Sequence, residues 1–313
     1  MAHKKYLLDL SLIRAEMDRR HWLQKQLADE ARVALRSVTS LFKGKAVTYA
    51  VAANLARALD LSVFALTEKH LHVGAGWLDV PDLDTTHERL LIDALQKDMR
   101  GLHAEAARLC QRILRELPDL DDERRMFVRV KLATINDNGG RHAEALALLE
   151  TILNDTSLVN RVPGRVLFWA RYHRALSLRR LRRLDEAKNA FQTLLAQDNQ
   201  HAVASINHQL GVVYLELARQ GKSTLDEALS CLQKSREIWQ RAGNHREGFS
   251  LRRLAEASAL RGKLAKAVEL YANAIAVFAF HQCARYVEQS VAELLELARR
   301  SFKLPAKRGQ TIV

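Results

Sequence analysis

Proline, cysteine and aromatic residues are scarce in this chain. Its 313 residues include 4 prolines and 3 cysteines, and aromatic residues make up 6% of the sequence. Proline interrupts helices, and runs of β-branched residues, which favour strands, are almost absent. Alanine, leucine, arginine and glutamate, all common in helices, dominate instead. We therefore expect an all-α protein with room for two or more domains, each with its own core.

The three cysteines, Cys110, Cys231 and Cys283, lie far apart and form no Cys-x-x-Cys pair. An odd and scattered set argues against a disulfide framework or a zinc site and fits buried thiols in a reducing compartment. The histidines are too dispersed to suggest a ligand set. We expect no metal site.

Long apolar runs and catalytic motifs are also missing. No stretch approaches the roughly 18 apolar residues of a membrane span, and Asp9, Arg14 and Glu16 interrupt any signal-peptide core. There is no HExxH motif and no glycine-rich phosphate loop. We expect a cytoplasmic protein with no membrane partner, no cofactor and no enzyme activity.

The net charge of +13 favours a polyanionic or acidic partner. Residues 1–80 hold 12 basic and 8 acidic residues, a net charge of +4, which leaves +9 for residues 81–313. Most of the excess charge therefore lies outside the N-terminal segment. Charge alone does not locate a nucleic-acid site.

Four short helices are expected at the N-terminus. Leu8, Leu12, Ile13 and Met17 recur at helical spacing. Further amphipathic segments cover 23–31, 34–42 and 49–59. The second and third segments are separated by a very short turn, which is the outline of a helix-turn-helix, whose second helix can enter a DNA major groove.

The stretch 13–61 resembles the xenobiotic-response-element or Cro/phage-repressor family of helix-turn-helix domains. The matching motifs are Gln24-x-x-Leu27-Ala28, the Lys43-Gly44-Lys45 string and the closing segment 55–59. The resemblance implies that residues 1–70 bind double-stranded DNA. It places base contacts at Leu35, Arg36, Ser37, Thr39 and Ser40, and phosphate contacts at Gln24, Lys43 and Lys45.

Arg36 is the best candidate base reader, because a guanidinium can bond guanine O6 and N7 together. Three features depart from the family pattern. Arg32 replaces the turn glycine, and Phe42 replaces an acidic residue. The capping serines or threonines of the second and third helices are replaced by Trp22 or Leu23 and by Ala34. A bundle retained only for protein contacts remains an alternative.

Residues 71–86 contain Gly74, Gly76 and Pro81 and are interpreted as a linker. Trp77 in this segment either docks one domain on the other or is a linker aromatic with no further role. Residues 301–313 are expected to form a basic flexible tail.

Residues 87–300 contain an internal repeat of small residues. Each unit has a small residue followed by a second one 12 residues later, or 17 in the fourth unit, where residues 220–223 mark an enlarged turn. The first members are Ala94, Ala133, Ala175, Gly211 and Ala255, and the second are Ala106, Ala145, Ala187, Ala228 and Ala267. Small residues let two antiparallel helices approach closely.

These strings resemble the tetratricopeptide repeat, with Pro118, Gly211 and Tyr214 at consensus positions. Successive second alanines are 39, 42, 41 and 39 residues apart, which exceeds the standard 34 and predicts longer helices. The resemblance implies a right-handed superhelix of about five repeats, with a capping helix near 283–300.

Such an array has a concave groove lined by the first helix of each pair. Candidate ligand residues there are Arg129, Asn136, Tyr172, Arg179, Asn207, His208, Arg252 and Glu256. Arginines and amides suit an extended peptide, particularly an acidic one. Alternatively, Asn136 and Asn207 are helix-end residues and Tyr172 belongs to the core. The arginine-rich string 165–183 either binds an acidic partner or flanking DNA, or is a solvated basic face.

The combination of the two domains resembles bacterial peptide-responsive regulators of the quorum-sensing type. By that resemblance the chain is a homodimeric transcriptional regulator, with a peptide or protein ligand in the repeat groove. The alternative is a scaffold or adaptor in which the N-terminal bundle is a protein-docking module.

Overall fold

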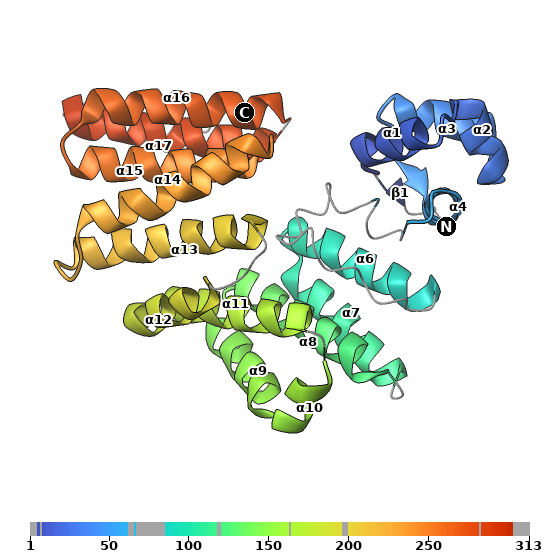
Figure 1. Ribbon diagram of the computed structural model, residues 1–313, viewed down its shortest axis with the longest axis horizontal. Coiled ribbons are helices and arrows are strands. Elements are labelled where there is room, and N and C mark those ends of the chain that lie inside the picture. The colour runs from blue at the N-terminus through green and yellow to red at the C-terminus, as the bar shows by residue number, and fades with distance from the viewer. Residues whose placement is uncertain are drawn as a thin grey trace. The chain divides into compact units, whose positions relative to one another are not determined.

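The computed structural model describes residues 5–6, 8–61, 66, 85–117, 120–162, 164–195, 200–281 and 283–302. These residues are almost entirely helical (Figure 1). They belong to two compact units, 1–177 and 178–313. No helix in the described part is long and apolar enough to cross a membrane. Most of the expected linker, Trp77, Pro118 and the tail beyond residue 302 lie outside the described residues.

The N-terminal bundle has the four expected helices, namely α1 (Leu10–Arg19), α2 (Gln24–Glu30), α3 (Leu35–Phe42) and α4 (Tyr49–Ala58). Its core contains Ile13, Leu27, Leu41 and Leu55, none more than 1% exposed. A short antiparallel ladder joins β1 (Lys5–Tyr6) to β2 (Val47–Thr48). Helical periodicity could not predict this ladder, because each strand has only two residues.

Helical hairpins follow in the rest of unit 1. The first pair is α6 (Thr85–Met99) with α7 (His103–Glu116), and the second is α8 (Asp122–Asn138) with α9 (His142–Asn154). A short helix that the sequence did not indicate, α10 (Thr156–Arg161), precedes α11 (Gly164–Arg180). The unit boundary falls inside α11.

Unit 2 contains the last turn of α11 and a further series of helices. These are α12 (Leu184–Leu194), α13 (Gln200–Arg219), α14 (Leu225–Arg241), α15 (Arg246–Leu260), α16 (Leu264–Phe280) and α17 (Ala284–Phe302). Beyond residue 84 the described chain is a series of antiparallel helices that includes the pairs α6 with α7, α8 with α9, α13 with α14 and α15 with α16, followed by α17.

The small residues of the repeat are all buried, as the sequence pattern predicted. Gly211 of α13 shows why, because a Cβ atom there would lie 2.5 Å from Leu232 Cγ and 3.2 Å from Ala228 O of α14. The helices approach too closely for a larger side chain. The enlarged turn is also confirmed, since α13 ends at Arg219 and α14 begins only at Leu225.

Candidate nucleic-acid face and candidate ligand face

The turn between α2 and α3 holds the third helix at a fixed angle to the second. Val38 and Leu41 of α3 are 0% and 1% exposed, so one side of α3 is anchored in the bundle core. Arg32 has φ +52°, a left-handed conformation that glycine adopts more readily. A non-glycine residue pays roughly 1 kcal/mol for this conformation. Val33 N donates to Ala28 O at 3.0 Å and closes the turn.

The opposite side of α3 and the residues after it carry the candidate DNA contacts. Leu35 is 46% exposed, and Arg36, Lys43 and Lys45 are exposed as well. Among the described residues, no ion pair involves these three cations. The other candidates, Gln24, Ser37, Thr39 and Ser40, are half-buried. The structure therefore places a cationic edge beside a row of small polar side chains.

Two of the departures from the family pattern have local explanations. Phe42 lies under the Arg14 guanidinium, whose carbon is 5.5 Å from the ring centre, so an aromatic contact occupies the position where an acid is usual. The start of α2 lacks a hydroxyl cap, but Gln26 Oε1 accepts from Leu23 N at 2.6 Å. Ala34 gives α3 no side-chain cap.

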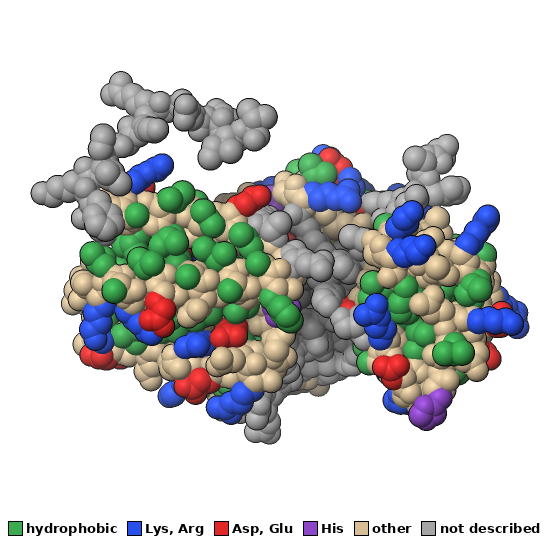
Figure 2. Space-filling model, turned by 90° about the horizontal axis from the view of Figure 1, so that it is seen from above, with side chains coloured by type: hydrophobic (Ala, Val, Ile, Leu, Met, Phe, Trp, Pro, Cys, Tyr) green, Lys and Arg blue, Asp and Glu red, His purple; other side chains and the backbone are tan. Residues whose placement is uncertain are grey.

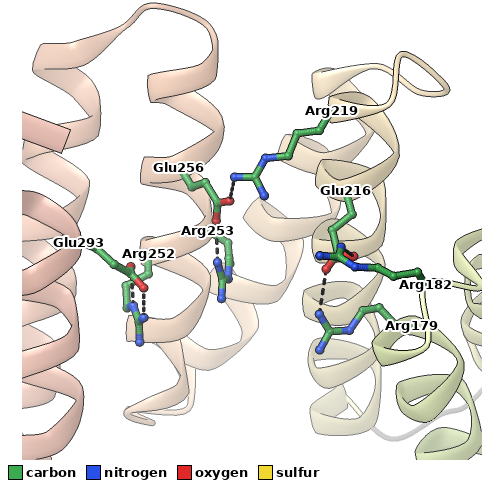
Figure 3. Close-up of polar contacts among 8 residues, drawn as sticks. All are labelled: Arg179, Arg182, Glu216, Arg219, Arg252, Arg253, Glu256 and Glu293. Carbon is green, nitrogen blue, oxygen red and sulfur yellow. Dashed lines mark hydrogen bonds and ion pairs between the residues drawn. The ribbon is translucent and has the colours of Figure 1, made fainter. Parts of the chain in front are cut away.

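A row of arginine and glutamate side chains connects successive first helices of unit 2 (Figure 3). We call it the arginine row. It consists of Arg179, Arg182, Glu216, Arg219, Arg252, Arg253, Glu256 and Glu293. Each glutamate accepts from an arginine of the preceding first helix or from the turn that follows that helix. The sequence separations are 37, 37 and 41 residues, close to one repeat.

The contacts are short and partly buried. Glu216 of α13 accepts from Arg179 Nη1 at 3.1 Å and from Arg182 Nη1 at 2.6 Å. Glu256 of α15 pairs with Arg219 and accepts from Arg253 Nη1 at 2.6 Å.

Five arginines face three glutamates in the row, which leaves a formal charge of +2. Burial lowers the pKa of Arg179, and Glu216 only partly offsets this effect. Its Nε atom is also buried without a hydrogen-bond partner among the described residues. A buried cation whose charge is not fully compensated is unfavourable. The Arg179 end of the arginine row therefore suits an added anionic group.

His208 of α13 lies among the same cations. Burial, together with the charges of Arg253, Arg179, Arg246 and Arg252, lowers the pKa of His208 to about 3. The neutral ring has Nδ1 3.3 Å from Ser250 Oγ, which is 3.0 Å from Ser235 Oγ. Because the imidazole of His208 is neutral, the positive charge at this site comes from the arginines.

The structure thus brings together four sequence-predicted ligand residues: Arg179, His208, Arg252 and Glu256. Three of the candidates need correction as accessible groove residues. Arg252 is only 8% exposed, because it packs beside α17 and pairs with Glu293. Tyr172 is only 6% exposed and packs against Phe168 and Trp169, one turn earlier in α11, so these aromatic side chains belong to the core. Asn207 is 5% exposed and donates to Val203 O of its own helix at 2.9 Å.

The remaining two candidates lie in unit 1, on α8. Arg129 is half-buried, and Asn136 Oδ1 accepts from Arg141 Nη2 at 2.7 Å. Asn136 therefore supports the turn into α9. This matches the helix-end interpretation that the sequence left open.

Sequence reasoning missed Glu216, Arg219, Arg253 and Glu293. The signal that could have found them is the recurrence of arginine and glutamate one repeat apart. The arginine-rich string 165–183 is also largely paired within the chain: Arg174 contacts Glu150, Arg179 and Arg182 contact Glu216, and Arg183 contacts Glu186. Within the described ranges, no cluster of three or more histidine, cysteine or acidic residues could hold a metal ion.

Sequence comparison identifies two segments of the chain. Residues 169–198 and residues 220–279 match tetratricopeptide repeat family models. No curated protein sequence matches the chain.

Comparison of the fold finds similar solved structures at low sequence identity. PlcR from Bacillus thuringiensis, in complex with the peptide PapR7 and DNA, has a TM-score of 0.57 and 14% identity, covering 90% of this chain and 98% of that one. A Rap protein complexed with competence and sporulation factor has a TM-score of 0.61 and 13% identity, with 90% and 80% covered.

A signal transduction ATPase with a tetratricopeptide repeat sensor from Pyrococcus horikoshii has a TM-score of 0.56 and 14% identity, with 88% of this chain and 46% of that chain covered. Identities this low establish the fold alone. The family matches and the observed helix pairs agree on one conclusion: the chain is all-α and contains tetratricopeptide repeats.

Proposed function

We propose that this chain is a sequence-specific DNA-binding transcriptional regulator that acts as a homodimer and responds to an acidic peptide or protein ligand. The observation that carries the proposal is the exposed edge of α3. Arg36, Lys43 and Lys45 project there from a helix anchored by buried Val38 and Leu41, with no described ion pair to neutralise them. A helix held in this way can enter a major groove with its cations outermost.

Side-chain chemistry indicates which of these residues contact phosphates and which contact bases. Lys43 and Lys45 lie just beyond α3 and meet phosphates, which sets register and salt dependence without reading sequence. Arg36 in the first turn of α3 reads guanine, and Leu35 beside it meets a thymine methyl. One short helix reads too few bases to select a genomic site, so two readers in a dimer are needed.

The arginine row supports the ligand part of the proposal. Its charge of +2 and the unpartnered Nε of Arg179 favour a ligand with carboxylates, which arginine binds in a bidentate manner. A carboxylate arriving at Arg179 or Arg219 competes with Glu216 or Glu256 for the same guanidinium. Because each glutamate belongs to the next first helix, such competition would loosen the link between neighbouring repeats.

The fold comparisons are compatible with this function. PlcR is bound to a peptide and to DNA, and the Rap protein is bound to competence and sporulation factor. Their folds can therefore carry peptide and, for PlcR, DNA. The likeness supports the proposal by analogy of architecture.

Selection from random double-stranded DNA tests the reader. The full-length chain should enrich a motif with two related half-sites about one helical turn, or a multiple of it, apart. Arg36→Ala should weaken enrichment and relax the preference at the base that Arg36 reads, whereas Arg57→Ala, which removes an exposed arginine of α4, should leave it intact. Failure of the wild-type chain to enrich any motif would overturn the DNA-binding proposal.

Titration with synthetic hexapeptides of aspartate and of lysine tests the ligand face in the full-length chain. The acidic peptide should bind and the basic one should not. Arg253→Gln should weaken the acidic peptide at least about fivefold, because a charge-assisted bond is worth about 1.5–3 kcal/mol. Arg241→Gln is a control, since its side chain is 77% exposed and it lies outside the row. Equal binding of both peptides would remove the acidic-ligand proposal.

A protein-docking role for the bundle has one observation in its favour. Leu23 is 73% exposed and Leu35 is 46% exposed, and apolar surface of this kind suits protein contacts. The DNA selection separates the two functions. A scaffold would enrich no motif and would be insensitive to Arg36→Ala.

A further inference from the structure

The last two helices of unit 2 expose apolar side chains. Leu264 and Val268 of α16 are 41% and 45% exposed, and Val291 and Leu295 of α17 are 38% and 52% exposed. Figure 2 shows apolar side chains gathered on the surface of this part of the molecule. We call this surface the end face. It consists of Leu264, Val268, Ala272, Val291, Ala292 and Leu295.

The six residues of the end face are uncharged, and exposed Glu288 and Arg299, four residues before Ala292 and four after Leu295, lie at its two ends on α17. Leu264, Val268 and Ala272 are four residues apart, and so are Val291 and Leu295, so each set follows one side of its helix. The nearby charged residues of α16 are Lys266 and Glu269, which lie on another side of the helix and pair with each other at 2.7 Å.

The position of the end face within the repeat explains its composition. Glu256 of α15 and Glu293 of α17 each accept an arginine from the preceding first helix and are 37 residues apart. By this offset, Val291, Ala292 and Leu295 correspond to Leu254, Ala255 and Ser258. Those three residues are 5%, 0% and 7% exposed, because α15 packs closely on its second helix, α16.

Helix α17 therefore presents the side with which a first helix packs on its second helix. No second helix follows α17 in the described part of the chain. The terminal unit of a repeat array ordinarily has a polar outer face. Here the exposed side of α17 carries Val291 and Leu295 in succession, and apolar side chains grouped in this way suit an interaction surface.

We propose that the end face is the interface of a homodimer, in which α16 and α17 of one copy pack against α16 and α17 of a second copy around a two-fold axis. Each copy then covers the exposed apolar side of α17 in the other. An isologous contact brings a surface against itself, so it must not carry excess charge of one sign. The end face meets this condition, and the arginine row does not.

The choice of a second copy rests on the proposed function, because a two-fold operator requires two readers. The residues after α17 are a poor match for the end face. Residues 303–313 contain Pro305, three basic residues and only Leu304, Ile312 and Val313 as large apolar side chains.

Sedimentation equilibrium of the full-length chain over a range of concentrations tests this proposal. We expect a dimer of two 35.5 kDa chains. Val268→Lys and Leu295→Lys each place a charge in the centre of the face and should raise the dimer dissociation constant at least about a hundredfold. Both side chains are about half exposed, so the monomer should still fold, which circular dichroism and thermal melting would verify.

Leu102→Lys is the matched control, because Leu102 is 42% exposed at the start of α7 in unit 1. It should leave the dimer unchanged. A wild-type dimer that both end-face variants leave intact would overturn the assignment of this surface. A wild-type monomer, or a chain that dimerises only after removal of residues 303–313, would overturn the second copy as occupant.

DNA binding distinguishes this proposal from the function on which it rests. A dimer that is sensitive to the end-face variants but enriches no DNA motif keeps the interface and removes the regulator function. A monomer that enriches a motif removes the dimer interface and keeps the DNA-binding function.

Discussion

Arg252 of α15 and Glu293 of α17 form a bidentate ion pair that joins the two helices. The two residues are 41 positions apart in the sequence. Arg252 Nε donates to Glu293 Oε2 at 3.0 Å and Nη2 donates to Oε1, while the arginine side chain is only 9% exposed. The pair fixes the last helix to the repeat before it.

Arg252→Met should therefore destabilise the chain. The substitution keeps the volume but leaves the half-buried Glu293 carboxylate without its main partner, which costs about 1–3 kcal/mol. Urea unfolding followed by circular dichroism measures the change. Arg241→Met, which removes an exposed pair with Glu237, should change the free energy of unfolding by less than about 0.5 kcal/mol. Equal effects of the two substitutions would contradict the role of Arg252.

Gly211→Ala tests the close contact between α13 and α14. The added Cβ meets Leu232 Cγ at 2.5 Å and the Ala228 carbonyl at 3.2 Å, so the helices must separate. We expect a loss of about 1–3 kcal/mol in the free energy of unfolding. Gly164→Ala is the control, because nothing lies within 4 Å of a Cβ at that position. A neutral Gly211→Ala variant would show that the helices pack less closely than described.

The acid sensitivity of the fold should depend on His208. Its pKa is lowered to about 3, whereas an unperturbed histidine titrates near 6.5, so above pH 6.5 the ring is neutral in both the folded and the unfolded chain. Below pH 6.5 only the unfolded chain gains the proton, and stability falls with pH. His208→Gln should lose about 1–2 kcal/mol less than the wild type between pH 7 and pH 5.

Thermal melting of both proteins at the two pH values measures this difference. The other histidines titrate in both chains, so only the difference between the variants is assigned to His208. Identical losses in the two chains would show that the folded His208 accepts a proton normally.

The sequence predicted the helices and the repeat well, because both follow from local spacing. The buried Ala and Gly pairs mark the hairpins directly, and Val38 and Leu41 mark the anchored side of α3. The sequence alone could not decide whether Tyr172 of α11 lines the groove or belongs to the core, because an aromatic side chain suits both positions. The short ladder that pairs Tyr6 with Val47 could not be predicted either, because a strand of two residues shows no periodic pattern of apolar residues.

The arginine row was only partly predictable. Arg179, Arg252 and Glu256 were expected on first helices, but their pairing depends on side-chain reach between residues a repeat apart. Glu216 and Glu293 were missed because neither belongs to a motif. Their importance comes from the cations that the fold places beside them.

Lys43→Ala should weaken DNA binding without changing sequence preference. Lys43 is exposed beyond the end of α3, where a phosphate contact releases one counterion. The slope of log affinity against log salt should become shallower by about 0.9. Fluorescence anisotropy at several salt concentrations measures the slope, and Lys25→Ala, an exposed lysine of α2, provides a comparison. An unchanged slope for Lys43→Ala would exclude its phosphate contact.

The ratio of affinities for a selected DNA site and for a shuffled sequence, measured with wild type and Arg36→Ala at one fixed salt concentration, tests the central claim most directly. For the wild type we expect a ratio of at least about a thousand. Arg36→Ala should reduce affinity for the selected site about 5- to 150-fold and lower affinity for the shuffled sequence far less, because a bidentate base contact is worth about 1–3 kcal/mol. A wild-type ratio near one, or an equal loss on both sequences in Arg36→Ala, would contradict sequence-specific reading by α3.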